Sequence, residues 1–253
     1  MIKAIDTGSG PAIVWIHGFP LSSASFEPQL SIPGARHIVP DLPGFGASDP
    51  PSGAMSMDDY ADAIAGSMQS LGIASATLAG VSMGGYIVFA MMRRHPSLAS
   101  SVILIDTKES PDSPDAREGR AKTAEAVSRD GVDSVISAMY PKMLTPETIA
   151  LADWRAETVM RAMRSASVPG VTAALAAMAS RPDSAETIRN SAIPLLAVVG
   201  DQDAITPPAD SERMASLAAD GTLAVISDAA HLSNVERPAE FNRTVQAYLA
   251  RLR

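Results

Sequence analysis

The sequence of 253 residues contains no cysteine, which excludes disulfides, thiolate metal sites and a cysteine nucleophile. It also lacks an apolar run of the about 18 residues that cross a bilayer, and its first residues lack the apolar stretch of a signal peptide. Its lysines form no cluster, and the net charge of −8 disfavours binding to phosphate backbones. We therefore expect no nucleic-acid partner, no membrane partner and a cytoplasmic location.

Short apolar runs bounded by Gly, Pro or Asp alternate with helical patterns in the first and last parts of the chain. The runs, which are typical of buried parallel strands, are residues 12–17, 37–41, 75–81, 101–106, 193–201 and 222–228. Helical patterns cover residues 57–71 and 83–95, and lie near 208–219 and 238–251. This alternation predicts one doubly wound α/β sheet.

Residues 111–190 interrupt the alternation, because they contain no strand pattern. Ser113 and Pro114 are typical of a helix start and Gly131 of its end, and Thr145 with Pro146 repeats the start signal. The sequence thus predicts a core formed by residues 1–110 and 191–253, with residues 111–190 as a helical cap (lid).

The segment "GVSMGG", residues 80–85, lies between a predicted strand and a predicted helix. Its first five residues match G-x-S-x-G, a motif in which a strained strand-to-helix turn exposes a nucleophilic serine. Glycines two residues to either side leave room for such a turn. The pattern predicts Ser82 as a nucleophile near the positive end of a helix, although an ordinary glycine turn is the alternative.

A serine hydroxyl needs a neighbouring base to act as a nucleophile at neutral pH. His231 follows the last predicted strand, so its loop lies at the same carboxyl edge of the sheet as Ser82. His95 lies beside arginines at a helix end, His37 begins a strand, and His17 is better explained by a structural hydrogen bond. We expect His231 to be the base.

The base in turn needs a carboxylate to orient it. Asp203 stands well into the loop after residues 193–199, and the chain order Ser, Asp, His matches this type of triad. Asp201, which reads as a turn former after a glycine, and Asp106, at the end of the preceding strand, are the rivals.

A tetrahedral oxyanion needs two N–H donors. The Met83 amide, directly after the nucleophile, is one candidate. The other is the Phe19 amide in "WIHGFP", where Gly18 allows close approach of the backbone and Pro20 has no N–H to donate. No metal or organic cofactor is expected, since the chain has no ligand cluster and "GFGASD" lacks the third glycine of a dinucleotide site.

Five motifs in order make the sequence similar to the α/β-hydrolase superfamily over nearly the whole chain: "HGFP", "DLPGFGASD", "GVSMGG", "GDQDAITP" and "AAHLSNVERP". The resemblance implies a mostly parallel, doubly wound sheet of the eight-stranded type with a helical lid. It also implies Ser82 as nucleophile, Asp203 as acid, His231 as base, and the Phe19 and Met83 amides as the oxyanion hole. Serine at the turn differs from the aspartate of haloalkane dehalogenases and epoxide hydrolases.

Within the superfamily, the C-terminal segment resembles enol-lactonases and small carboxylesterases, and "VWIHGFPLSS" resembles esterases and cofactor-free haloperoxidases. We therefore expect a hydrolase of small to medium carboxylic esters. A lactonase using the same residues is the alternative, followed by a perhydrolase or haloperoxidase and by a non-hydrolytic ligand-binding member of the fold.

Apolar residues of the insertion are candidates to line the substrate pocket. They are Met139, Tyr140, Met143, Leu144, Trp154, Met160 and Met163. Arg155, Arg161 and Arg164 could bind a substrate carboxylate, although a solvated helix face is the better explanation of them.

Overall fold

The computed structural model describes residues 2–252, and its centre is a seven-stranded sheet in the order β1-β3-β2-β4-β5-β6-β7. The strands are β1 (Ala4–Gly8), β2 (Ala12–Ile16), β3 (Arg36–Pro40), β4 (Ala76–Val81), β5 (Ala99–Ile105), β6 (Leu195–Gly200) and β7 (Gly221–Ile226). β1 pairs antiparallel with β3, and the other neighbouring pairs are parallel. The expected α/β fold class is confirmed, with seven strands in the described residues.

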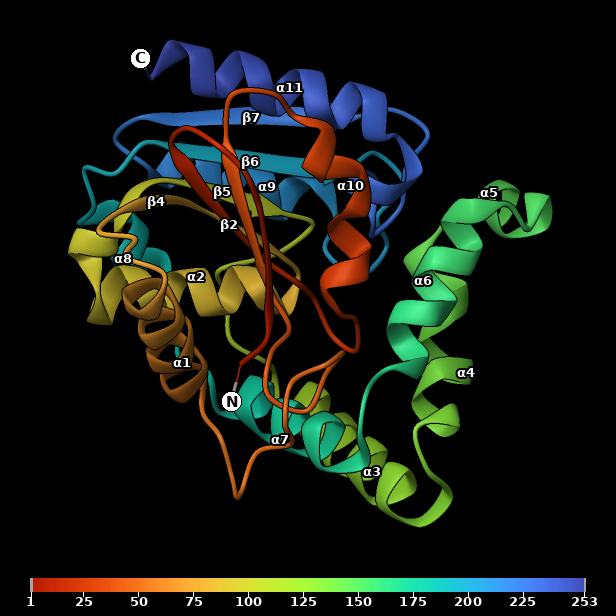
Figure 1. The fold of residues 1–253 in the computed structure, drawn as a ribbon. Coiled ribbons are helices and arrows are strands. Elements are labelled where there is room, and N and C mark those ends of the chain that lie inside the picture. The colour runs from red at the N-terminus through yellow and green to blue at the C-terminus, as the bar shows by residue number, and fades with distance from the viewer. Residues whose placement is uncertain (1, 253) are drawn as a thin grey trace.

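Helices lie on both faces of this sheet. They are α1 (Met57–Ser70), α2 (Met83–Arg94), α9 (Pro208–Leu217), α10 (Ser233–Glu236) and α11 (Pro238–Arg251), with 3₁₀ segments η1 (Ser23–Ser31) and η2 (Pro96–Leu98). Figure 1 shows α11 on one side of the strands and α1 and α2 on the other. No helix within residues 2–252 has the length and apolar character to cross a membrane.

Two buried hydrophobic clusters correspond to the two faces of the sheet. Val14 and Ile16 of β2 belong to one cluster and Ile13 and Trp15 to the other, because successive side chains of a strand point to opposite faces. Helices α1, α2 and α7 (Val168–Ser180) contribute to the first cluster, and η1, α6 (Trp154–Arg164) and α11 to the second. The sheet is therefore buried on both faces.

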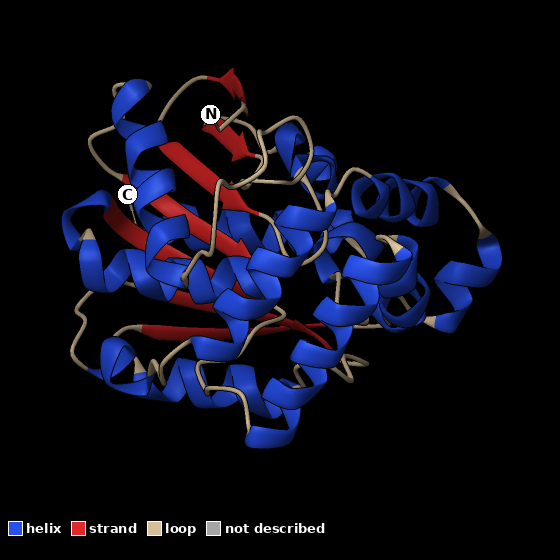
Figure 2. Ribbon diagram, turned by 90° about the horizontal axis from the view of Figure 1, so that it is seen from below, coloured by secondary structure: helices blue, strands red, loops and turns tan. Residues whose placement is uncertain are grey.

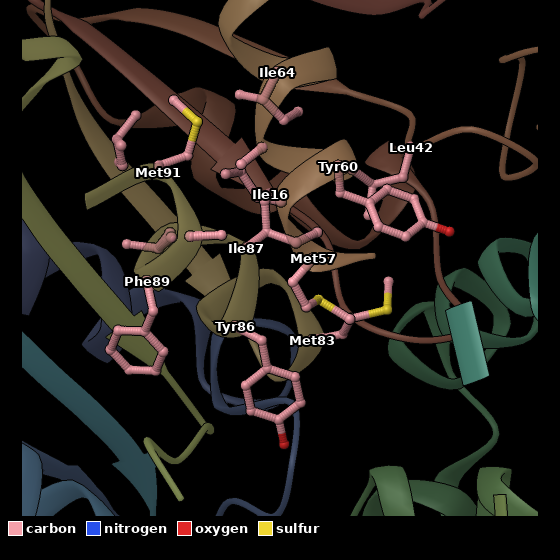
Figure 3. Packing of buried hydrophobic residues seen from close by; sticks show 14 of the residues in the cluster. Ile16, Leu42, Met57, Tyr60, Ile64, Met83, Tyr86, Ile87, Phe89 and Met91 are labelled. Atoms are coloured by element: carbon pink, nitrogen blue, oxygen red, sulfur yellow. The ribbon is translucent and has the colours of Figure 1, made fainter. Parts of the chain in front are cut away.

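Helix α2 is buried from Met83 to Met92. In Figure 3 its apolar side chains, among them Ile87, lie close to Ile16 of β2 and Ile64 of α1. A helix that is apolar around its circumference belongs in a core. The residue at its N-terminus, Ser82, consequently stands on a firmly packed support.

Between β5 and β6 the chain forms helices and no strand within the described residues. These helices are α3 (Pro114–Asp130), α4 (Asp133–Met143), α5 (Pro146–Leu151), α6 (Trp154–Arg164), α7 (Val168–Ser180) and α8 (Ala185–Arg189). We call residues 111–190 the insertion. In Figure 2 a group of helices without strands projects to one side of the sheet.

The helix starts in the insertion follow the sequence signals. The Ser113 hydroxyl accepts a hydrogen bond from the Ala116 amide (3.2 Å), and α3 begins at Pro114. The pattern after Thr145, which reads as one helical stretch, forms two helices, because Ala152 adopts a left-handed conformation (φ +46°). The second, α6, starts where Asp153 accepts from the Arg155 amide (2.9 Å).

Candidate active site

The turn between β4 and α2 holds Ser82 in an unusual conformation, with φ +53° and ψ −115°. For a residue other than glycine such a backbone costs about 1–3 kcal/mol and persists only where the surroundings fix it. The Ser82 amide donates to the Ile105 carbonyl (2.9 Å), and the Thr107 hydroxyl donates to the Ser82 carbonyl (2.7 Å). Both partners belong to β5 and the residues just after it, so two strands position the turn.

Glycines on both sides of Ser82 allow the main chains to touch. A Cβ on Gly80 would lie 2.3 Å from the Gly84 carbonyl carbon, and a Cβ on Gly84 would lie 2.1 Å from the Ile16 carbonyl oxygen. No L side chain fits at either distance. The start of α2 is thus pressed directly onto the ends of β4 and β2.

Three polar side chains that are distant in the sequence meet at this turn. The Ser82 hydroxyl lies 2.9 Å from His231 Nε2, and His231 Nδ1 lies 2.9 Å from Asp203 Oδ2. His231 lies in the loop after β7 and Asp203 in the loop after β6. His231 and Asp203 are buried, whereas Ser82 is partly exposed. The arrangement joins a hydroxyl, a ring and a carboxylate in one chain of hydrogen bonds.

Asp203 is also held by its own loop. Its Oδ1 accepts from the Ile205 and Thr206 amides (2.8 and 3.0 Å), and its Oδ2 accepts from the Thr206 hydroxyl (2.7 Å). Burial acts to raise the pKa of Asp203, but the hydrogen bond and charge of His231 and the Thr206 bonds outweigh it, so this pKa is lowered. The carboxylate is thereby kept ionised.

His231 has a raised pKa. Burial acts to lower the pKa of the ring, yet the hydrogen bond and charge of Asp203, together with the charge of Asp106, outweigh it. The ring is consequently more basic than an ordinary histidine.

The two rival acids make other contacts. Asp106 is fully buried and accepts from the Gly200 amide (2.9 Å) and from the amide and hydroxyl of Ser233 (3.0 and 2.7 Å). Burial and the charge of Asp203 raise the pKa of Asp106 to about 7. Asp201 is exposed and accepts from the Ala229 amide (3.2 Å). Neither carboxylate is hydrogen-bonded to the His231 ring within the described chain.

The loop after β2 approaches Ser82 from the other side. A Cβ on Gly18 would lie 3.2 Å from Ser82 Cβ, so the loop backbone touches the turn. Within residues 2–252 neither the Phe19 amide nor the Met83 amide donates a hydrogen bond to another residue. Both donors remain available near Ser82, while the Phe19 and Met83 side chains are buried.

His17 fixes this loop. Its Nδ1–H donates to the Gly18 carbonyl (2.9 Å), and its Nε2 accepts from the Leu42 amide (3.0 Å). Burial lowers the pKa of the His17 ring, which favours its neutral form. The structural hydrogen bond expected for this residue is present.

The other two histidines lie outside the hydrogen-bonded group at Ser82. His37 accepts from Trp15 Nε1 (3.1 Å) and its Nε2 bonds to the Ile32 carbonyl (2.9 Å). His95 is paired with Asp62 on the surface (2.7 Å).

The insertion residues expected to line a pocket have different environments. Met143, Leu144 and Met163 are buried in the cluster shared with η1 and α10, while Met139 is half-buried. Trp154 is 48% exposed. A groove of about 680 Å³ is lined by Tyr140, Ala152, Ala156, Glu157, Met160, Arg161, Arg164 and Ser165. It brings together two of the expected pocket residues, Tyr140 and Met160, and its lining does not include Ser82 or His231.

Two of the three arginines considered for a substrate carboxylate are paired with the protein. Arg155 binds Asp153 (2.8 Å), and Arg161 binds Glu27 of η1 (2.8 Å). Arg164 lines the groove.

Thr107 and Thr206 were not anticipated from the sequence. Each contacts the group at Ser82 through its hydroxyl, and only their short distance in the chain from Asp106 and Asp203 could have drawn attention to them. As for metals, residues 2–252 contain no group of three or more His, Asp or Glu side chains that could hold an ion.

The chain is similar to known proteins in both sequence and structure. A family model described as alpha/beta hydrolase fold matches residues 11–238. A solved thermophilic esterase from Thermogutta terrifontis, with malate bound, superposes with a TM-score of 0.96 at 36% identity, covering 99% of this chain and 93% of that one.

Two curated relatives are more distant. The 3-oxoadipate enol-lactonase 2 of Acinetobacter baylyi is 26% identical, covering 95% of this chain and 89% of its own length. A non-heme chloroperoxidase from Kitasatospora aureofaciens is 28% identical, covering 96% of this chain and 94% of its own length.

Proposed function

The chain belongs to the α/β hydrolase family, and on that premise we propose that it is a serine hydrolase of small to medium carboxylic esters. The observation that carries the proposal is the continuous path from Ser82 Oγ to His231 Nε2 and from His231 Nδ1 to Asp203 Oδ2, with both distances 2.9 Å. The esterase from T. terrifontis, at 36% identity, supports the same reaction class.

In the first half of the reaction, Ser82 Oγ attacks the ester carbonyl carbon while His231 Nε2 takes the hydroxyl proton. Asp203 holds the ring with Nε2 unprotonated and stabilises the imidazolium that forms. The carbonyl oxygen becomes an oxyanion between the Phe19 and Met83 amides, two donors without a protein acceptor in the described chain. The alcohol leaves with the proton from His231, and the acyl group stays on Ser82.

In the second half, His231 removes a proton from water, and the resulting nucleophile attacks the acyl carbon. Collapse of the oxyanion breaks the bond to Ser82 Oγ, which recovers its proton from His231. The free acid is released. The raised pKa of His231 suits this role, because a more basic ring takes the proton of Ser82 or of water more readily.

We also propose that residues 111–190 act as a cap over the site, with the groove at α4, α5 and α6 as part of the path for the acyl group. The half-buried Tyr140 and Met160 in this groove support that assignment. The buried Met143, Leu144 and Met163 would then act by packing.

Lactone hydrolysis is the second candidate. It is favoured by the enol-lactonase relative, which aligns over 95% of this chain, and would use the same three residues. Comparing kcat/KM on lactones and on open-chain esters of equal size decides between the two. A perhydrolase activity, in which peroxide replaces water at the acyl-enzyme, is supported only by the chloroperoxidase relative.

The test is a panel of p-nitrophenyl esters and lactones with the wild type and Ser82→Ala. We expect Ser82→Ala to lower kcat by roughly 10⁴- to 10⁶-fold without unfolding the protein. Ser216→Ala, which removes an exposed hydroxyl on α9, is the matched control and should keep full activity. Labelling of Ser82 by a fluorophosphonate reports the nucleophile directly. A wild type without ester or lactone hydrolysis and without labelling would leave a ligand-binding role.

A further inference from the structure

Glu236, at the end of α10, binds two distant parts of the chain through its carboxylate. The side chain is buried, with 2% of the residue exposed. Its Oε2 accepts from the Ala230 amide (2.6 Å), and its Oε1 accepts from the amide and the hydroxyl of Thr145 (both 2.8 Å). Within residues 2–252 this carboxylate has no ion pair.

The two partners of Glu236 have different positions relative to the site. Ala230 directly precedes His231. Thr145 is the N-cap of α5 and lies in the insertion, at the junction between α4 and α5. The main-chain carbonyl of Glu236 also accepts from Arg155 of α6 (3.2 Å). One residue therefore joins the loop of His231 to two helices of the insertion.

Three carboxylates hold the loop around His231. Asp201 accepts from the Ala229 amide, Glu236 from the Ala230 amide, and Asp106 from the Ser233 amide. Asp201 and Asp106 lie in the loops that follow β6 and β5. Among these three contacts, only the one made by Glu236 continues into the insertion.

A carboxylate is required at this position because three donors point at it. An amide of the same size has only one oxygen, so its NH₂ group would face at least one of those donors. A buried donor that loses its acceptor destabilises the local structure, and a small displacement of a reacting group lowers the rate by up to about 100-fold. A weakened bond at Ala230 would shift the backbone that carries the His231 ring.

This inference rests on the ester-hydrolase proposal. We propose that Glu236 is a positioning residue: through its bonds to Thr145, it makes the alignment of His231 with Ser82 depend on the position of the α4–α5 junction. With Thr145 in place, Glu236 is fixed and its Oε2 holds the loop before His231. When the junction moves away, Glu236 is released and the ring loses its alignment. The full rate of hydrolysis then requires that Thr145 is bound to Glu236.

The experiment combines Glu236→Gln, Thr145→Val and the double variant. In Glu236→Gln the amide oxygen is expected to stay with the two Thr145 donors and the NH₂ group to face the Ala230 amide. This should lower kcat by about 10- to 100-fold with little change in KM. Thr145→Val removes one donor and should lower kcat by roughly two- to fivefold, whereas Thr145→Ser should keep the wild-type rate. The double variant should match Glu236→Gln, because the two residues act in series.

The downfield proton resonance of His231 Nδ1–H gives a readout that needs no substrate. We expect it to shift or broaden in Glu236→Gln and in Thr145→Val. Glu240→Gln, on α11, and Thr172→Val, whose hydroxyl bonds within α7, are matched controls that should leave both the resonance and kcat unchanged.

Wild-type kcat and an unchanged resonance in both folded variants would overturn the proposal, as would a lower melting temperature with unchanged kcat. Effects that multiply in the double variant would overturn the coupling to Thr145. If Glu236→Gln does not fold, Thr145→Val and Thr145→Ser carry the same test alone. If the wild type hydrolyses no ester but Thr145→Val still shifts the His231 resonance, the proposed function is rejected and the positioning role is supported.

Discussion

The turn at Ser82 and the helices of the insertion are held in place by different kinds of contact. At the turn, a Cβ on Gly84 would lie 2.1 Å from a main-chain oxygen of β2. In the insertion, Gly119 and Gly131 have nothing within 4 Å of a built Cβ. The third glycine of the insertion, Gly170, does approach a main chain closely: a Cβ there would lie 2.5 Å from the Gly44 carbonyl oxygen, where α7 meets the loop after β3.

Side chains also connect the insertion to the rest of the described chain, residues 2–110 and 191–252, which we call the sheet domain. Arg181 donates to the Ser110 carbonyl (2.9 Å) and stacks on Tyr86, Arg161 pairs with Glu27, and Thr145 binds Glu236. Main-chain contact cannot be altered by a surface substitution, whereas each of these contacts can be removed singly. The turn at Ser82 is thus fixed by main-chain packing, whereas several contacts of the insertion can be removed one side chain at a time.

The largest effect is expected in the hydrogen-bonded group of Ser82, His231 and Asp203. Asp203→Asn should lower kcat/KM by roughly 10³- to 10⁴-fold, because an amide facing Nδ1 favours the wrong His231 tautomer. The proposed base, His231, would act only when neutral, above its pKa, and Asp203 is the main group that raises this pKa. In the variant, the loss of activity on acidification should therefore move to lower pH. A pH profile of kcat/KM measures both effects.

Asp201→Asn is the control for this variant, since Asp201 lies in the same loop and is exposed, and asparagine keeps the one oxygen that accepts from the Ala229 amide. It should retain nearly the wild-type profile. If Asp203→Asn stays active and Asp106→Asn loses activity instead, Asp106 orients the ring.

A smaller effect, on stability, compares the two regions directly. Gly84→Ala places a methyl group against the Ile16 carbonyl and should lower the free energy of unfolding by about 1–3 kcal/mol or more. Gly119→Ala, in an open part of α3, should raise it by about 0.5–1 kcal/mol through helix propensity. Urea unfolding of both variants measures the difference. Changes of the same sign would contradict the contrast between the regions.

The smallest effect concerns substrate preference. Met160→Ala, in the groove at α4, α5 and α6, should raise KM for long acyl chains by about two- to tenfold and leave short esters unaffected. A series of p-nitrophenyl esters of increasing length measures this. Leu151→Ala, at a position 58% exposed and outside the groove lining, is the control. Equal effects of the two variants at every length would remove the groove from the acyl path.

The sequence was most informative where function depends on a local pattern. The turn at Ser82 could be predicted because its glycines lie within a few residues of it. His231 and Asp203 could be proposed because loops after parallel strands meet at one edge of the sheet. The sequence favoured Asp203 over Asp201 and Asp106 through chain order and its place in the loop, whereas the distances to the His231 ring come only from the folded chain.

Two features gave no usable signal. β1 was not anticipated, because Ala4–Gly8 is largely exposed and Ile5 is its one residue that is half-buried, so the segment lacks an apolar pattern. The contact between Glu236 and Thr145 joins residues 91 positions apart. Neither residue belongs to a motif that indicates the other, and only the folded chain brings them together.

The chain has two tryptophans, one in the central sheet and one in the insertion. Trp15 is fully buried beside Phe26 in the sheet domain, and Trp154 is 48% exposed at the start of α6. An indole in contact with water fluoresces at longer wavelength and is quenched by iodide, and a buried one is protected. The protein consequently carries an optical reporter for each part: iodide quenching follows the insertion, and Trp154→Phe leaves emission from the sheet domain alone.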